Sequence, residues 1–193
     1  MESHFYAMMS RLKFIDRWAL MRNSTSENLS EHSLEVAMLA HALAVIGNRY
    51  LGKDLDEKQA AVIAMYHDAT EIITGDMPTP IKYFNPEIRQ AFQAIEANAA
   101  SRLVGLLPEE LQKDFQAIFE PGEEYAYEKK LIKAADKLSA LIKCIEEAKA
   151  GNREFVQAER ATEESLHAMD LPEVAYFMEH FLPSYYKTLD ELQ

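Results

Sequence analysis

Apolar residues recur with a helical period along almost the whole chain. Over residues 3–14, for example, they fall at Phe5, Met8, Met9 and Leu12, which would lie on one side of a helix. No segment alternates apolar and polar residues in the manner of a half-buried strand. The pattern therefore predicts an all-α protein.

Capping residues mark the ends of the predicted helices. The first long helix covers about residues 30–47, with Asn28 or Ser30 as its N-cap, and it ends at Gly47. Later helices follow the same rules, since each starts near a proline or acidic residue and several end at a glycine. They are predicted over 56–74, 87–106, 108–119, 127–150 and 153–168, and a last one begins at Pro172.

The helix predicted over 56–74 carries an imidazole and a carboxylate side by side after an apolar run. These are His67 and Asp68, and Glu71 follows three residues later. If the helix continues to Gly75, the three side chains project from one side. Apolar surroundings make such a cluster costly unless a cation or polar partners satisfy it. The pattern indicates metal ligands beside an acid/base group.

Candidates for further ligands lie on two other helices. His32 is on the apolar side of the first long helix, one turn before Val36, whereas His41 is on a different face. A structural or solvated histidine at a helix start is the alternative. On the helix predicted over 127–150, Asp136 points away from the apolar stripe, so periodicity alone predicts a solvated carboxylate there.

Two segments without a helical period could contact a substrate. Residues 16–26 include Arg17 and Trp18, a guanidinium and an aromatic ring suited to a phosphate and a nucleoside. Alternatively, Trp18 packs on the core and Arg17 is solvated. Residues 75–80 contain two prolines and leave the helix at the end that carries Glu71. This loop either contacts substrate or is a rigid turn.

Composition limits the class of protein. At 193 residues and 48% hydrophobic, the chain is expected to form one domain over residues 1–193. A net charge of −12 without a basic run argues against binding a nucleic acid polymer. The lone Cys144 excludes an internal disulfide and suggests a buried, inert thiol. The first residues do not resemble a leader, and no apolar run approaches the ~18 residues of a membrane span. We therefore expect a cytoplasmic protein with no membrane partner.

The order of the candidate ligands resembles the signature of the HD-domain phosphohydrolases, a histidine, a His-Asp pair and a distant aspartate. Longer segments extend the similarity over nearly the whole chain, to the bacterial 5′-deoxynucleotidases of the YfbR type. The segments that carry it are residues 10–13, 16–18, 27–33, 65–71, 75–84 and 143–147, together with the aromatic C-terminal helix.

The resemblance implies a single HD-domain helical bundle and a role for each candidate residue. Glu71 would be the catalytic acid/base, and Arg17 would orient the phosphate. Trp18 would help hold the nucleoside and disfavour a ribose 2′-hydroxyl. The implied metal ligands are His32, His67, Asp68 and Asp136, and the implied substrate contacts are Arg17, Trp18, Asp68, Asp76, Met77, Pro78, Thr79 and Asp136.

The implied reaction is hydrolysis of a deoxyribonucleoside 5′-monophosphate to a deoxynucleoside and phosphate. Two imidazoles and two carboxylates suit one Co²⁺ or Mn²⁺, or a Zn²⁺, better than Mg²⁺. The resemblance also implies a homodimer. No histidine lies between His67 and His167, which favours one metal over two.

Other functions of the same fold stay open. A deoxynucleoside triphosphate triphosphohydrolase would need more cations for its extra phosphates than this chain offers near the motifs. A (p)ppGpp hydrolase usually follows the equivalent glutamate with an aspartate, where this chain has Ile72. A non-catalytic nucleotide-binding HD module would bind metal without turnover.

Overall fold

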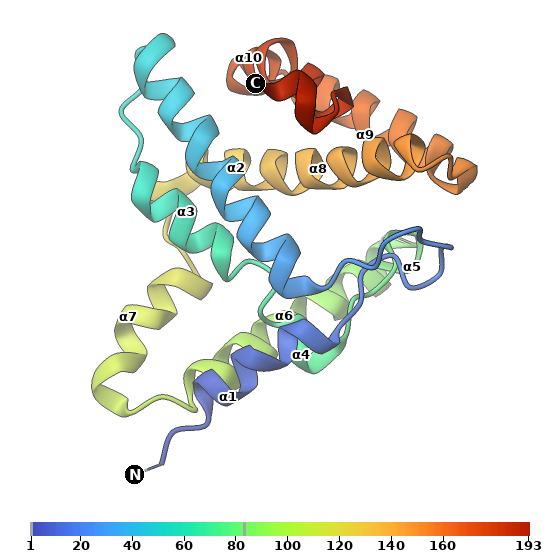
Figure 1. The fold of residues 1–193 in the computed structure, drawn as a ribbon. Helices are drawn as coiled ribbons and strands as arrows, with labels where there is room; N and C mark the ends of the chain where they lie inside the picture. Colours follow the sequence, from blue (N-terminus) through green and yellow to red (C-terminus); the bar gives the residue numbers. More distant parts are fainter. Residues whose placement is uncertain (1, 83) are drawn as a thin grey trace.

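The protein is a bundle of helices, described here from a computed structural model that covers residues 2–82 and 84–193, apart from the side chain of Thr79 (Figure 1). In this part of the chain, the β-structure is a single antiparallel bridge between Asp16 and Asn28. The expectation of an all-α fold is confirmed.

The α-helices follow one another with short connections, several of which are 3₁₀ turns. Their bounds are α1 Phe5–Met9, α2 Leu29–Tyr50, α3 Glu57–Met65, α4 Glu71–Thr74, α5 Thr79–Lys82, α6 Pro86–Val104, α7 Glu109–Phe119, α8 Ala126–Lys149, α9 Val156–Ala168 and α10 Pro172–His180.

The main hydrophobic core lies between α2, α3 and α8, which pack directly against one another. Fully buried side chains such as Val36, Leu43, Leu138 and Ile142 fill it. Helix α9 runs along α8, and α10 packs against α2 at the upper end in Figure 1. A smaller cluster around Phe5 joins α1 to α6 and α7. The core thus holds α2, the end of α3 and the middle of α8 at fixed positions.

Helix α2 begins where the sequence predicts and ends later. The Asn28 side chain accepts from the N–H groups of Ser30 and Glu31, and Glu31 bonds back to the N–H of Asn28, which forms a capping box. The predicted end at Gly47 is wrong, because the helix continues to Tyr50. Gly47 is instead a point of close approach, where a Cβ would lie 3.1 Å from a carboxylate oxygen of Glu173.

The helix predicted over 56–74 is interrupted, which corrects the expectation of one continuous helix to Gly75. It ends at Met65, and the turns that follow use i→i+3 hydrogen bonds until α4 begins at Glu71. The Nδ1 atom of His67 lies 2.7 Å from the carbonyl oxygen of Ala64. In a continuous helix this oxygen would accept the hydrogen bond from the backbone N–H of Asp68. The histidine itself therefore competes with the helix.

Most other predicted helices match to within a few residues. The helix expected over 3–14 divides into α1 and the 3₁₀ helix Ser10–Phe14, and the Ser10 hydroxyl bonds the carbonyl of Tyr6 at this junction. Of the C-terminal aromatic side chains, Phe177 is buried in the core, whereas Phe181 and Tyr186 stay about half exposed.

Helix α2 is long and apolar enough to cross a membrane by length and composition, although Glu35 and His41 interrupt its apolar residues. No other helix in the described part of the chain does so. Just over half of its apolar window, 56%, is buried inside the protein. Its packing in the main core accounts for the apolar character.

Candidate metal centre

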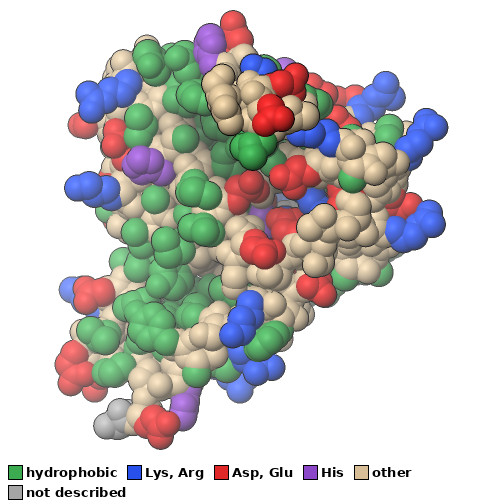
Figure 2. Space-filling view, in the orientation of Figure 1, with side chains coloured by type: hydrophobic (Ala, Val, Ile, Leu, Met, Phe, Trp, Pro, Cys, Tyr) green, Lys and Arg blue, Asp and Glu red, His purple; other side chains and the backbone are tan. Residues whose placement is uncertain are grey.

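Four polar side chains meet where α2, the turn after α3 and α8 come together. His32 comes from the first turn of α2, and Asp136 comes from α8. His32 Nε2 lies 3.2 Å from Asp136 Oδ1 and 3.4 Å from Asp68 Oδ2, and His67 Nε2 lies 3.1 Å from Asp68 Oδ2. Figure 2 shows histidine and acidic side chains gathered in a hollow near the centre of this face. All four implied ligands are thus brought together.

Asp136 corrects the prediction from periodicity. It faces His32 and Arg17 rather than open solvent, although 42% of its side chain is exposed. The apolar stripe of α8 reports only the face that packs on the main core. A second face of the same helix buries polar groups, among them Ser139, Lys143 and Glu147. Asp136 lies at the start of that polar face.

Both imidazoles have a fixed orientation. The Nδ1–H of His67 donates to the Ala64 carbonyl at 2.7 Å. The Ser139 hydroxyl uses its only hydrogen to donate to Glu35 at 2.6 Å, so it accepts from Nδ1 of His32 at 3.0 Å. In both rings Nδ1 has its own hydrogen-bond acceptor, so Nε2 is the atom that faces the carboxylates and would bind a metal once it is free of its proton.

The donor set fits a cation. The Nε2 atoms of His32 and His67 are buried and make no hydrogen bond within the described part of the chain. One ligand atom from each of His32, His67 and Asp68 lies within 4.8 Å of the others, and Asp136 adds a fourth group. Buried polar atoms without partners are costly, and a divalent ion would satisfy them. Two nitrogen and two oxygen ligands suit a transition metal.

In the absence of a cation, the imidazoles of His32 and His67 retain extra protons. Burial opposes a positive charge on His32, but the nearby carboxylates of Asp136, Asp68 and Glu27 outweigh it and raise the pKa of this imidazole to about 10. Burial also opposes the charge on His67, yet the Asp68 carboxylate raises the pKa of that ring as well. A cation must displace these protons, so its affinity should weaken as the pH falls.

Glu71 stands beside the four candidate ligands as a separate acid. Its side chain is buried, and its Oε2 has no hydrogen-bond partner in the described structure. Burial, and then the charges of Asp68 and Asp76, raise the pKa of this carboxyl to about 9. A protonated carboxyl at neutral pH can donate a proton to a leaving group, and an added cation would ease its ionisation.

Arg17 and Trp18 lie next to the candidate ligands, in a loop held by Glu27. Arg17 Nη1 is 2.9 Å from Glu27 Oε1, and its Nη2 is 3.8 Å from Asp136. The Trp18 indole donates to Glu27 Oε2 at 2.9 Å, and its ring packs edge-on against the buried Phe155. The alternative of a solvated Arg17 is therefore wrong, whereas Trp18 packs on a buried residue and also stands beside the site.

The loop after α4 carries Asp76 close to the charged groups of the site. Gly75 ends α4 with φ +72°, a conformation that favours glycine. Burial raises the pKa of the half-buried Asp76, and Arg17 and Asp68 are among the charges that act on it. Met77 and Pro78 are half-buried, and Thr79 begins α5, but its side chain lies outside the described part.

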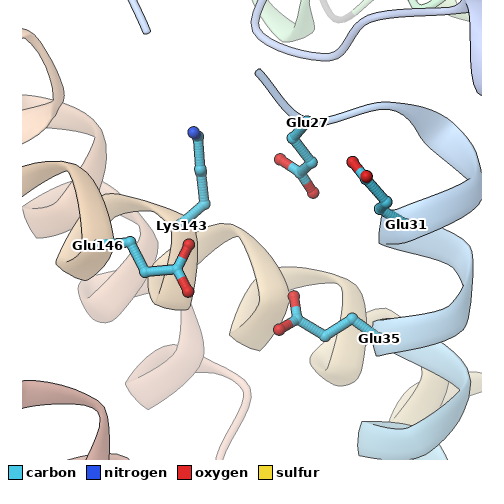
Figure 3. Close-up of a pocket in the computed structure, with 5 residues that line it drawn as sticks. All are labelled: Glu27, Glu31, Glu35, Lys143 and Glu146. Carbon is cyan, nitrogen blue, oxygen red and sulfur yellow. The ribbon is translucent and has the colours of Figure 1, made fainter. Parts of the chain in front are cut away.

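Ser139 and Glu35, which orient His32, gave no recognisable signal in the sequence. Lys143 and Glu147 lie in a segment that carries the resemblance, but only the structure shows that this buried pair holds the backbone of Ser24 and Thr25. Behind Glu27 lies a cavity of about 180 Å³ between α2 and α8, shown in Figure 3. The residues that line it are Glu27, Glu31, Glu35, Lys143 and Glu146.

Removing the Ser139 hydroxyl tests whether it positions His32. We expect Ser139→Ala to weaken Co²⁺ binding by about 10- to 100-fold, since the ring loses the acceptor that fixes its tautomer. Ser33→Ala is the matched control, because the buried Ser33 hydroxyl makes no hydrogen bond in the described structure. Calorimetric titration of the chelated proteins measures both affinities, and equal weakening in the two variants would contradict this role.

The raised pKa values predict how the metal-free protein responds to pH. Folded Glu71 keeps its proton up to about pH 9 and unfolded Glu71 loses it near 4.5, while His32 shifts from 6.5 to about 10. The folded state binds more protons throughout this range, so its free energy of unfolding should fall as the pH rises from about 5 to 10. Urea unfolding with chelator should show lower stability at about pH 9 than at about pH 6. A stability that rises over this interval would contradict the prediction.

The chain matches proteins of one family along its length. A family model described as 5′-deoxynucleotidase YfbR-like matches residues 4–185. The chain is 52% identical to "5′-deoxynucleotidase YfbR" of Escherichia coli O1:K1 over 194 aligned residues, covering 99% of this chain and 96% of the relative. It is 51% identical to "5′-deoxynucleotidase" of Yersinia pestis, covering 98% and 96% of the two chains.

Solved structures with the same fold are more distant in sequence. An HD-domain phosphohydrolase of Listeria innocua superposes with a TM-score of 0.81 at 22% identity, covering 94% of this chain and 88% of that one. The HD phosphohydrolase DatZ of cyanophage S-2L, bound to dA and one catalytic Zn²⁺, superposes with a TM-score of 0.68 at 24% identity, covering 94% and 96%. These likenesses confirm the HD-domain fold.

Proposed function

This chain belongs to the family of YfbR-like 5′-deoxynucleotidases, and we infer from that membership and from the metal centre that it hydrolyses deoxyribonucleoside 5′-monophosphates to deoxynucleosides and phosphate. The observation that carries the inference is the convergence of His32, His67, Asp68 and Asp136 with an unligated acid, Glu71, beside them. Relatives that are half identical over the whole chain bear the name of this activity.

The charges of the site suit a phosphate monoester. Arg17 is held with its guanidinium between Glu27 and Asp136, so its remaining N–H groups are available to a phosphate oxygen beside the ligands. The protein as a whole carries a charge of −12, which disfavours long polyanions. One small phosphate held by Arg17 and a cation is compatible with this charge.

The proposed roles of the site residues are of two kinds, binding of the metal ion and transfer of protons. His32, His67, Asp68 and Asp136 would hold a divalent ion, which when bound supplies charge neutralisation at the phosphoryl group and lowers the pKa of water. Glu71, kept off these ligands, would take the proton of the attacking water and return one to the leaving 5′-oxygen. Its buried carboxyl can hold a proton at neutral pH, as the second step needs.

The nucleoside would rest on the two loops beside the ligands. We propose that Trp18 and the segment from Asp76 to Thr79 contact the sugar and base, with Asp68 and Asp136 also close to the substrate. Trp18 lies directly after the phosphate-orienting Arg17, and its indole N–H is already bound to Glu27. An indole held in this way would leave little room for a 2′-hydroxyl, which favours deoxyribose.

The metal identity follows from the ligand chemistry. Two imidazole nitrogens favour Co²⁺, Mn²⁺ or Zn²⁺ over Mg²⁺, which prefers oxygen ligands and retains its waters. We propose one such ion and favour Co²⁺ or Mn²⁺.

Phosphate release tests the proposed function. The chelated protein is supplied with Co²⁺, Mn²⁺, Zn²⁺ or Mg²⁺ and with a panel of 5′-deoxyribo- and 5′-ribonucleoside monophosphates. We expect turnover with the transition metals and a preference for the deoxy substrates. Equal rates on both sugars would remove the selectivity and leave the phosphohydrolase, whereas no release with any metal would overturn the proposal.

A deoxynucleoside triphosphate triphosphohydrolase and a non-catalytic binding module are the competing functions. Tripolyphosphate release from a deoxynucleoside triphosphate would support the first of these. Bound metal and nucleotide without turnover would support the second. The buried, unligated Glu71 favours an enzyme over a binding module.

We further propose that residues 1–193 form one domain and that the protein is a cytoplasmic homodimer. The ligands come from elements spread between residues 32 and 136, which supports one domain. Leu34 and Met38, one turn apart on α2, are 56% and 58% exposed and are available to a second copy. Light scattering on the purified protein would measure the mass in solution.

A further inference from the structure

Glu27 uses both of its carboxylate oxygens to hold two different side chains. Its Oε1 accepts from Arg17 Nη1 at 2.9 Å, and its Oε2 accepts from Trp18 Nε1 at 2.9 Å. We propose that Glu27 is a positioning residue that sets the preference for deoxyribose over ribose, by fixing the guanidinium and the indole in one geometry. The proposal rests on the proposed function, since it concerns the same substrate.

Backbone hydrogen bonds fix the position of Glu27 relative to Arg17 and Trp18. Its carbonyl accepts from the N–H of Arg17 at 2.9 Å, and the adjacent residues Asp16 and Asn28 form the isolated antiparallel bridge. Asn28 is in turn the N-cap of α2. The segment that carries Arg17 and Trp18 is thus aligned with the start of the helix that carries His32. Glu27 occupies the junction between substrate loop and metal centre.

The indole needs such a partner. Trp18 has φ +60°, a left-handed conformation that is an outlier for a bulky side chain and persists only where surrounding contacts stabilise it. Its ring meets Phe155 edge-on, with centroids 5.3 Å apart, on the side of the 3₁₀ helix before α9. That contact limits how far the ring can shift, and the bond to Glu27 fixes its rotation. A small movement of this ring would change the space beside the sugar.

Glu27 also faces the metal ligand His32. Its Oε1 lies 3.5 Å from His32 Nδ1, while 13% of its side chain is exposed. The Glu27 carboxylate is therefore next to three proposed functional groups, namely Arg17 for the phosphate, Trp18 for the sugar and His32 for the cation. A displaced Glu27 would misalign the sugar relative to the reacting phosphate without removing any of the four metal ligands.

Glu27→Gln is the informative variant because it removes one acceptor oxygen and the negative charge while keeping the shape of the side chain. In glutamine an NH₂ donor replaces one of the two carboxylate oxygens, so either the guanidinium or the indole would face a donor where Glu27 offers it an acceptor. The size of the side chain is nearly unchanged. We expect the ratio of kcat/KM for a deoxy- over a ribonucleoside monophosphate to fall by about tenfold, with the metal content retained.

Two further variants separate positioning from general damage. Glu146→Gln is the matched control, because Glu146 lines the same acidic cavity from α8, as Figure 3 shows, and this substitution removes the same charge. Trp18→Phe removes the N–H and keeps an aromatic ring. If Glu27 acts through the indole, Glu27→Gln in the Trp18→Phe background should change the sugar ratio much less than it does in the wild type.

The deciding measurement is kcat/KM for one deoxy- and ribonucleotide pair, with metal content measured on each variant. A lower ratio in Glu27→Gln, an unchanged ratio in Glu146→Gln and non-additivity with Trp18→Phe would support the proposal. A wild-type ratio retained in Glu27→Gln, or a ratio near one in the wild type, would overturn it and leave the proposed hydrolysis intact. A wild type inactive on every monophosphate would overturn both. Should Glu27→Gln fail to fold, a deoxy preference unchanged in Trp18→Phe would still overturn the proposal.

Discussion

Replacing Glu71 by glutamine will lower kcat by about 100- to 10,000-fold while the metal stays bound. The amide can neither take the proton of the attacking water nor return one to the leaving oxygen. Glutamine resembles the neutral carboxyl that burial and the Asp68 and Asp76 charges favour at this position, so the fold should be preserved. Single-turnover phosphate release, together with metal analysis of the same sample, measures the effect, and Glu71→Ala should likewise be inactive.

The control for this experiment is Glu163→Gln on the exposed side of α9. It makes the same chemical change away from the ligands and should turn over at the wild-type rate. Wild-type turnover in Glu71→Gln, with metal bound, would contradict the acid/base role.

The second large effect is expected at His67. His67→Ala should weaken the binding of Co²⁺ by at least roughly 100-fold, more than a change in a residue that merely supports a ligand. The Nε2 of this ring is buried without a hydrogen-bond partner in the described structure and faces Asp68 at 3.1 Å. Its loss leaves one imidazole and two carboxylates. Turnover at sub-saturating metal should fall in parallel.

His41→Ala is the matched control, since His41 is exposed on another face of α2. Calorimetric titration with Co²⁺ compares the two variants, and thermal unfolding in chelator checks that both fold. Unchanged Co²⁺ affinity in His67→Ala would remove this residue from the ligand set, whereas weakening of similar size in His41→Ala would indicate a general effect.

The break between α3 and α4 shows where sequence periodicity is insufficient. Residues 56–74 have the apolar spacing of one helix, and the prediction of a continuous helix was wrong. The deviation arises at a single side chain, because His67 takes the carbonyl of Ala64 for its own Nδ1–H. Helical periodicity describes burial and carries no information about such a side-chain bond. The break nevertheless leaves Asp68 within reach of both imidazoles.

Asp136 and Trp18 show the same limit at longer range. Periodicity predicted a solvated Asp136, since it measures only the apolar face of α8, and the resemblance alone indicated a ligand. For Trp18 the sequence left packing and substrate contact as alternatives. The structure shows that the ring packs on Phe155 and that its N–H faces Glu27. Phe155 and Glu27 are too far from Trp18 along the chain for a local sequence pattern to reveal either contact.

The sequence by itself determined the all-α fold and the start of α2 near Asn28 or Ser30. The order of His32, His67, Asp68 and Asp136, together with the longer matching segments, indicated the family. These depend on local periodicity, capping and motif order. Only the tertiary structure decided that the Nε2 atoms face the carboxylates, that Ser139 orients His32 and that Glu27 joins Arg17 to Trp18. Those contacts join side chains far apart along the chain or in irregular loops, so they exist only once the helices have packed.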